Sequence, residues 1–112
     1  MITGIIYSII DDGYFYIGST IQSLERRLIS HISCSKNEKF KLKLYTYINE
    51  KRNGNWDDII IIPLETVECD TKYELEKKEY EYIKKHIKDP YCLNSIQSHT
   101  QKFAIIRSKF KR

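Results

Sequence analysis

Two short apolar runs separated by a turn sequence open the chain. Residues 4–10 are rich in β-branched and aromatic side chains, residues 11–13 read Asp-Asp-Gly, and residues 14–18 are again aromatic and apolar. β-branched and aromatic residues favour strands, and an Asp-Gly pair between two such runs favours a tight turn. The pattern therefore predicts a β-hairpin.

The position of the turn decides which residues of the hairpin face each other. A two-residue loop of type I′ at positions 12 and 13 pairs Tyr7 with Gly18, whereas a loop at positions 11 and 12 sets Tyr7 opposite Tyr16. Side chains alternate between the two faces of a strand. The two tyrosines therefore project from the same face in either register.

A leucine or isoleucine stands at every fourth position from residue 24 to residue 32, which predicts a helix that ends near residue 33. Ser23 or Thr20 can cap it, because a side-chain oxygen at that place accepts a hydrogen bond from a free backbone N–H group. Arg27 and His31 lie at the margin of the apolar stripe, whereas Arg26 points nearly opposite it. Arg27 is thus the arginine placed to face a groove.

A second helix and a third strand are predicted in the middle of the chain. The helix spans roughly residues 39–51, and the Asn-Gly-Asn sequence at residues 53–55 stops it. Its expected buried residues are Phe40, Leu44, Tyr47 and Ile48. Residues 56–67 then form a strand, in which four consecutive isoleucines at 59–62 indicate burial on both faces.

A third helix is predicted from Asp70 or Thr71, as its cap, to about Ile87. Its apolar stripe contains Leu75, Tyr82 and Ile83, with His86 at the margin. Glu79 lies at the centre of this stripe. A carboxylate directed toward a protein core is costly to desolvate, so Glu79 needs a metal ion, an arginine or water as its partner.

Composition and length are typical of one small globular domain. The chain has 112 residues, of which 41% are hydrophobic and 30% are charged. No apolar run is long enough to cross a bilayer, and the N-terminal pattern does not fit a signal peptide, so we expect an intracellular protein. The cysteines are far apart and are expected to be reduced thiols: Cys34, Cys69 and Cys92.

Charge is distributed in blocks along the chain. Residues 21–52 carry eight basic and three acidic residues, and residues 98–112 carry five basic and no acidic ones, whereas residues 53–97 have a net charge of −4. Two basic segments around an acidic one suit a polyanionic partner, although blocks of this size are common on ordinary solvated surfaces.

Five pieces of the sequence together resemble the GIY-YIG nuclease domain. In order along the chain they are Ile5-Ile6-Tyr7, Tyr16-Ile17-Gly18-Ser19-Thr20, Arg27-Leu28-Ile29-Ser30-His31, Glu79-Tyr80-Glu81-Tyr82-Ile83 and Asn94. Their order and spacing cover the chain up to about Ile96. Ile5 stands where the first motif of the family has its glycine, and Gly4 lies one position earlier.

The resemblance implies an α/β (α+β) fold with a small three-stranded antiparallel sheet flanked by three or more helices. Residues 1–97 would form the catalytic domain and residues 98–112 a basic C-terminal tail. The implied reaction is hydrolysis of a DNA phosphodiester with one divalent ion, Mg²⁺ or Mn²⁺. The relatives it suggests are homing endonucleases and nucleases of viruses or mobile elements.

The resemblance also assigns roles to the metal-binding and DNA-binding residues. Glu79 would hold the ion, since a hard cation with phosphate and water in its shell needs few protein carboxylates. Arg27 would contact the scissile phosphate through its planar set of donors. Independently of the resemblance, the basic charge of the last fifteen residues suggests contacts to the DNA backbone from Lys102, Arg107 and Lys109, although the same charge suits a disordered solubilising end equally well.

Four other residues complete the expected catalytic set. Tyr7 would act as general base, provided that the metal or a neighbour helps it to ionise. By similarity, Tyr16 would position the water or the phosphate and His31 would assist proton transfer. Asn94 would brace the site through hydrogen bonds.

These residues leave more than one function open. The leading hypothesis is a metal-dependent DNA endonuclease with low intrinsic sequence specificity, because the chain has little beyond the catalytic module. The alternative is a module of the same family in repair or recombination that binds DNA without cutting it or that cuts only with a partner subunit. Cleavage of both strands would require a homodimer or a second binding event.

Overall fold

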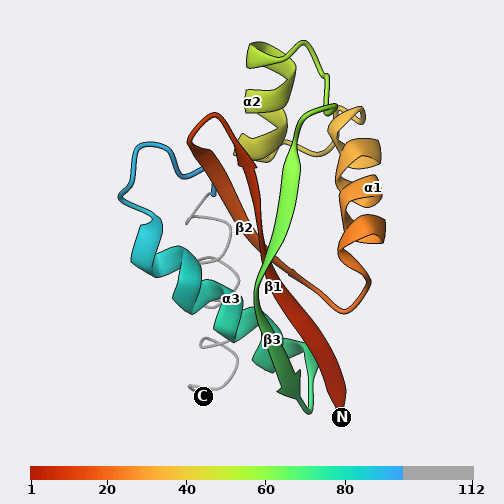
Figure 1. The fold of residues 1–112 in the computed structure, drawn as a ribbon, viewed down its shortest axis with the longest axis vertical. Coiled ribbons are helices and arrows are strands. Elements are labelled where there is room, and N and C mark those ends of the chain that lie inside the picture. The colour runs from red at the N-terminus through yellow and green to blue at the C-terminus, as the bar shows by residue number, and fades with distance from the viewer. Residues whose placement is uncertain (95–112) are drawn as a thin grey trace, which may run out of the picture.

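The computed structural model describes residues 1–94 and shows a three-stranded antiparallel sheet with helices on both faces (Figure 1). The strands are β1 (Ile2–Asp11), β2 (Tyr14–Thr20) and β3 (Ile60–Cys69), in the order β2-β1-β3. The helices are α1 (Leu24–Ser35), α2 (Lys43–Lys51) and α3 (Lys72–His86). The predicted fold class is confirmed. Among residues 1–94, none of the helices has the length and hydropathy needed to cross a membrane.

The hairpin of β1 and β2 has the register set by a loop at positions 12 and 13. Asp12 and Gly13 have φ angles of 48° and 82°, as a type I′ turn requires. Tyr7 consequently pairs with Gly18, and the alternative that sets Tyr7 opposite Tyr16 is wrong. As expected in either register, both tyrosines belong to one hydrophobic cluster on one face of the sheet.

β1 is the central strand and contributes to a separate hydrophobic core on each face of the sheet. Tyr7 and Ile9 pack with residues of α1 and α2 on one face. Ile6, together with Ile17 of β2, packs against α3 on the other. Since successive side chains of a strand point to opposite faces, a near-continuous apolar sequence is what a strand buried on both sides needs.

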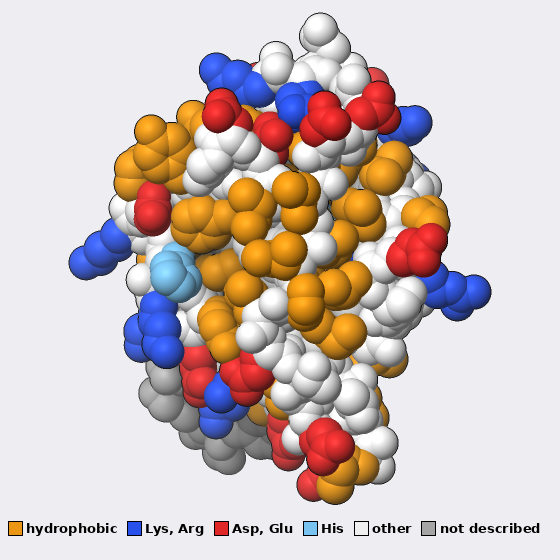
Figure 2. All heavy atoms as spheres, in the orientation of Figure 1, with side chains coloured by type: hydrophobic (Ala, Val, Ile, Leu, Met, Phe, Trp, Pro, Cys, Tyr) orange, Lys and Arg blue, Asp and Glu red, His pale blue; other side chains and the backbone are white. Residues whose placement is uncertain are grey.

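β3 is an edge strand, so the prediction that residues 59–62 are covered on both faces is wrong. The strand begins at Ile60, whose side chain is 57% exposed, and Leu64 is 41% exposed. Figure 2 shows apolar side chains gathered in the middle of the face that β3 crosses. Ile6 pairs with Glu65 but Tyr7 pairs with Pro63, so a bulge interrupts the ladder beside Tyr7. A proline and a bulge are both typical of sheet edges.

The first and third helices agree with the sequence prediction, and the second differs at its start. Ser23 and Thr71 cap α1 and α3, each accepting a hydrogen bond from a backbone N–H three residues later. α2 begins at Lys43 rather than near residue 39. Phe40 donates its backbone N–H to the carbonyl of Asn37 in a preceding turn and is 50% exposed, so its predicted burial is wrong.

Residues 91–94 cover the outer edge of β2. The N–H of Phe15 donates to the carbonyl of Tyr91 at 3.0 Å, and the N–H of Leu93 donates to the carbonyl of Phe15 at 2.7 Å. Phe15 and Cys92 form a parallel bridge. The segment therefore satisfies backbone groups that an uncovered edge strand would leave to solvent.

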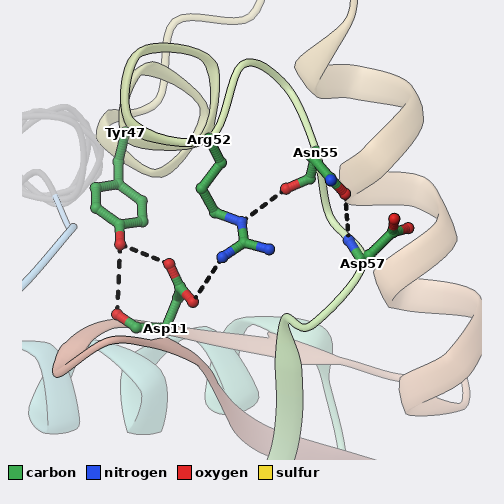
Figure 3. A network of polar contacts seen from close by, with 5 residues as sticks. All are labelled: Asp11, Tyr47, Arg52, Asn55 and Asp57. Carbon is green, nitrogen blue, oxygen red and sulfur yellow. Dashed lines mark hydrogen bonds and ion pairs between the residues drawn. The ribbon is translucent and has the colours of Figure 1, made fainter.

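A polar network joins the hairpin tip to the C-terminal end of α2 (Figure 3). The Tyr47 hydroxyl donates to Asp11 Oδ2 at 2.6 Å, and Arg52 Nη1 forms an ion pair with Asp11 Oδ1 at 3.1 Å. Arg52 Nε also donates to the carbonyl of Asn55 at 2.8 Å. Burial and the neighbouring carboxylate raise the pKa of Tyr47, so its hydroxyl keeps the proton that it donates.

We expect Asp11→Ala to lower the free energy of unfolding by about 1–3 kcal/mol, because Tyr47 and Arg52 then lose an acceptor in a partly buried place. Urea unfolding of the variant and the wild type measures the difference. Asp58→Ala, which removes an exposed carboxylate before β3, is the matched control and should change stability little. Equal stability of all three proteins would contradict a structural role for the network.

Candidate active site

Tyr7, Arg27 and His31 meet in one hydrogen-bonded group between β1 and α1. Tyr7 Oη lies 2.6 Å from His31 Nε2, and Arg27 Nε donates to Tyr7 Oη at 3.1 Å. Tyr7 and His31 are completely buried, whereas Arg27 is only partly so. The predicted helix geometry accounts for this arrangement, because residues 27 and 31 are one turn apart on the side of α1 that borders the sheet.

Gly18 provides the space that the Tyr7 ring occupies. A Cβ atom at position 18 would lie 2.6 Å from Tyr7 Cζ and 3.1 Å from Tyr16 Cε1, closer than van der Waals contact allows. The ring of Tyr16 is 6.5 Å from that of Tyr7 and 5.5 Å from that of His31, measured between centroids. The glycine after Tyr16-Ile17 therefore serves to place the Tyr7 hydroxyl.

Burial sets the protonation of the tyrosine and the histidine. Desolvation raises the pKa of Tyr7 to about 12, against the opposing effect of the Arg27 guanidinium. Desolvation, assisted by the charge of Arg27, lowers the pKa of His31 to about 3. At neutral pH Tyr7 is therefore a phenol and His31 a neutral imidazole.

The other two groups facing Tyr7 keep their usual charge states. Desolvation, with smaller effects from nearby charges, raises the pKa of Tyr16 well above its ordinary value, so it remains protonated. Burial alone would lower the pKa of Arg27, but its interactions with Tyr7 and Tyr16 outweigh this and raise it. The site thus holds one permanent positive charge beside two neutral phenols.

Glu79 approaches the site from the opposite face of the sheet. It is 8% exposed on α3, where the sequence placed it in the apolar stripe, and its Oε1 accepts a short hydrogen bond from the Ser19 hydroxyl. Its charge contributes to the raised pKa values of Tyr7 and Tyr16. The carboxylate therefore acts electrostatically on the tyrosines across β2.

Asn94 braces the strand that carries Tyr16 and Gly18. Its Oδ1 accepts from the N–H of Ile17 at 2.9 Å, and its Nδ2 donates to the carbonyl of Ile17 at 2.8 Å. The residue is 2% exposed. This bidentate contact has the hydrogen-bonding character predicted for Asn94, and its direct partner is the β2 backbone.

A divalent ion fits the chemistry of Glu79. No cluster of three or more His, Cys, Asp or Glu side chains suited to a metal occurs among residues 1–94. Mg²⁺ commonly binds through one or two carboxylates and fills its shell with water and phosphate oxygens. A buried carboxylate with the Ser19 hydroxyl beside it is therefore an adequate donor set.

Two contacts of the site were missed in the sequence. Ser19 donates to Glu79, and Tyr45 Oη lies 2.8 Å from His31 Nδ1. Alternation along β2 could have placed Ser19 on the face opposite Tyr16 and Gly18. The sequence indicates little about Tyr45, which is only placed next to Leu44 on the second predicted helix.

The predicted DNA contacts at Lys102, Arg107 and Lys109 lie outside the described residues, as does the tail at residues 98–112. They remain predictions. All six predicted catalytic positions lie within the described part of the chain. Four of them lie together on the face of the sheet that α1 covers, namely Tyr7, Tyr16, Arg27 and His31, and Glu79 acts on the two tyrosines through its charge.

A comparison with protein families matches the part of the chain that contains the candidate active site. The model of the GIY-YIG catalytic domain matches residues 3–91, which include every predicted catalytic residue except Asn94. No curated protein and no solved structure matches the chain. The family match covers most of the sequence and, together with the three-stranded antiparallel sheet and its helices, shows that the chain belongs to the GIY-YIG family of nuclease domains.

Proposed function

We propose that this protein is a metal-dependent DNA endonuclease that hydrolyses phosphodiester bonds with low intrinsic sequence specificity. The observation that carries the proposal is the hydrogen-bonded chain from the half-buried Arg27 through Tyr7 to His31, with the charge of Glu79 acting on Tyr7. Phosphodiester hydrolysis needs a base for the attacking water, positive charge at the phosphate oxygens and help for the leaving oxygen. The four residues offer groups suited to these tasks.

Arg27 is suited to the phosphate. Its Nε–H is used by Tyr7, and no hydrogen bond to its two terminal NH₂ groups is found within residues 1–94, so they form a planar pair of donors suited to phosphate. Holding the guanidinium through Nε fixes its orientation before the substrate binds. Contacts to phosphate carry no sequence information directly, which agrees with low specificity.

Tyr7 and His31 are suited to moving a proton from the attacking water. The O–H bond of Tyr7 breaks as its proton moves to His31 Nε2, and the tyrosine oxygen takes a proton from water as the water oxygen bonds to phosphorus. The bond from phosphorus to the leaving sugar oxygen breaks in the same reaction, and that oxygen takes a proton from solvent. The raised pKa of Tyr7 and the lowered pKa of His31 both oppose a separate ionisation of Tyr7, so the two proton movements would occur together as the water attacks, with His31 Nε2, 2.6 Å from Tyr7 Oη, as the acceptor in position.

Glu79 would hold Mg²⁺ or Mn²⁺, with Ser19 orienting its carboxylate. When bound, such an ion would stabilise negative charge on the phosphate and lower the pKa of bound water. Glu79 would supply the carboxylate ligand of the ion, and Arg27 would supply the positive charge that the protein itself offers to the phosphate.

The biological setting is part of the same proposal. A nuclease with one such site would cut both strands only as a homodimer, with a partner subunit or by binding twice. The family resemblance suggests an enzyme of a virus or mobile element, and we propose that it acts inside the cell. Basic residues of 98–112, including Lys102, Arg107 and Lys109, would add contacts to the DNA backbone that do not depend on sequence.

Cleavage of supercoiled plasmid tests the enzyme directly. With Mg²⁺ or Mn²⁺ the wild type should produce nicked and then linear DNA, and a chelator should stop it. Glu79→Gln and Arg27→Ala should each lower the rate by at least about 100-fold, because each removes a charge that acts on the transition state. The readout is the initial nicking rate, with folding checked by circular dichroism.

Two exposed neighbours serve as matched controls for this assay. Glu81→Gln changes the same helix as Glu79, and Arg26→Ala changes the residue before Arg27, so both should cut at close to the wild-type rate. A wild type that binds DNA but cuts no plasmid, branched or single-stranded substrate would instead favour a binding module or one that requires a partner.

Stability should depend on pH through His31. Its pKa is near 6.5 in the unfolded chain and about 3 in the folded protein, so between these values only the unfolded chain binds the proton. The neutral, buried His31 therefore contributes fully to the free energy of unfolding above pH 6.5. As pH falls below this value, the free energy of unfolding decreases by about 1.4 kcal/mol per pH unit.

Urea unfolding of wild type and His31→Gln from pH 7 to pH 4 measures this dependence. The variant should show the shallower fall in unfolding free energy, while His86→Gln, which changes an exposed histidine, should follow the wild type. Parallel curves for wild type and His31→Gln would mean that the folded protein does not hold His31 neutral.

A further inference from the structure

The hydrogen-bond chain of the site continues beyond His31 to a second tyrosine. His31 Nε2 lies 2.6 Å from Tyr7 Oη, and His31 Nδ1 lies 2.8 Å from Tyr45 Oη. His31 is completely buried and Tyr45 is 4% exposed. Both nitrogens of the imidazole are therefore occupied by phenol hydroxyls in a place without bulk water.

The surroundings of Tyr7 decide which nitrogen carries the proton. A neutral imidazole has one N–H donor and one acceptor nitrogen. Tyr7 Oη already accepts the N–H of Arg27, and its own proton needs an acceptor. Among residues 1–94, His31 Nε2 is the acceptor found within hydrogen-bond distance of Tyr7 Oη. Nε2 is then the bare nitrogen, and the proton is on Nδ1, where it is donated to Tyr45.

Tyr45 can accept this hydrogen bond because its phenol oxygen carries lone pairs and lies 2.8 Å from His31 Nδ1. Desolvation, with a smaller contribution from the Cys34 thiol of α1, raises the pKa of Tyr45, so its hydroxyl keeps its own proton and its oxygen serves as the acceptor for Nδ1–H. Tyr45 is anchored in the core by its neighbours Leu44 and Ile48, and its ring contacts that of His31 edge-on, with centroids 5.8 Å apart. The acceptor for Nδ1–H is thus held in place by packing.

We propose that Tyr45 is a positioning residue of the nuclease, which holds His31 in the Nδ1–H tautomer so that Nε2 stays free to take the proton of Tyr7. The proposal rests on the proposed function. In the other tautomer Nε2–H would point at Tyr7 and could not accept its proton. When His31 gains that proton, both N–H groups already face hydroxyl oxygens, so no rearrangement at Tyr45 is needed.

The chain offers a matched pair of variants to test this role. Tyr45→Phe and Tyr47→Phe each remove one hydroxyl from α2 and keep the ring, but the Tyr47 hydroxyl bonds to Asp11 at the hairpin tip. We expect Tyr45→Phe to lower the nicking rate by about 10- to 100-fold, the usual effect of losing a group that orients a reactive residue. Tyr47→Phe should nick DNA at the wild-type rate with a similar loss of stability.

The tautomer of His31 gives a second readout that needs no activity. The ¹⁵N chemical shifts of the imidazole in labelled wild-type protein should show a protonated Nδ1 and a bare Nε2, and in Tyr45→Phe the populations should move toward Nε2–H. A wild type with the proton on Nε2 would overturn the inference, even if Tyr45→Phe failed to fold.

The two readouts separate failure of the inference from failure of the proposed function. A wild type that cuts DNA, with Tyr45→Phe cutting at the same rate, overturns the role of Tyr45 and leaves the nuclease standing. A wild type that cuts no substrate overturns the nuclease and with it the catalytic role of Tyr45, whatever tautomer His31 adopts.

Discussion

The Tyr7 hydroxyl is the contact on which the arrangement of this domain depends. It lies on the central strand, completely buried, and its hydrogen bonds to Arg27 and His31 tie β1 to α1. His31 continues the connection to α2 through Tyr45. A buried hydroxyl left without partners costs about 1–3 kcal/mol, so the sheet and two helices must keep the spacing that satisfies it. The same burial keeps His31 neutral and Tyr7 protonated.

The second constraint is that the site uses both faces of a thin sheet. β2 carries Tyr16 on the face of α1 and α2, and Ser19 on the face of α3, where it bonds to Glu79. Gly18 stands between them, and its missing side chain is where the Tyr7 ring lies. The cores on the two faces of the sheet thus support one site. Asn94 holds the outer edge of β2, the strand that carries Tyr16, Gly18 and Ser19.

The parts predicted correctly have signals contained in a few neighbouring residues. The hairpin and the common face of its two tyrosines follow from the residues around the turn, and the starts of α1 and α3 follow from cap residues before periodic segments. The sequence left two registers and two caps for each helix open, and the structure selects the loop at positions 12 and 13, Ser23 and Thr71. The predicted burial of Phe40 and of the isoleucine run in β3 is wrong because burial depends on which other elements pack against a residue. Phe40 fits a helical pattern but belongs to a turn, and the isoleucine run of β3 is apolar without lying in the middle of the sheet.

The sequence by itself determined the family, the hairpin and the faces on which Tyr7, Tyr16 and Glu79 would lie, because side-chain direction follows from the periods of strand and helix. Tertiary structure alone decided the partners of those residues. Ser19 and Glu79 are 60 positions apart, and Ile17 and Asn94 are 77 apart. His31 and Tyr45 stand on different helices. Such pairs form only when the packing of whole elements brings their atoms within hydrogen-bond distance, and no local pattern records that distance.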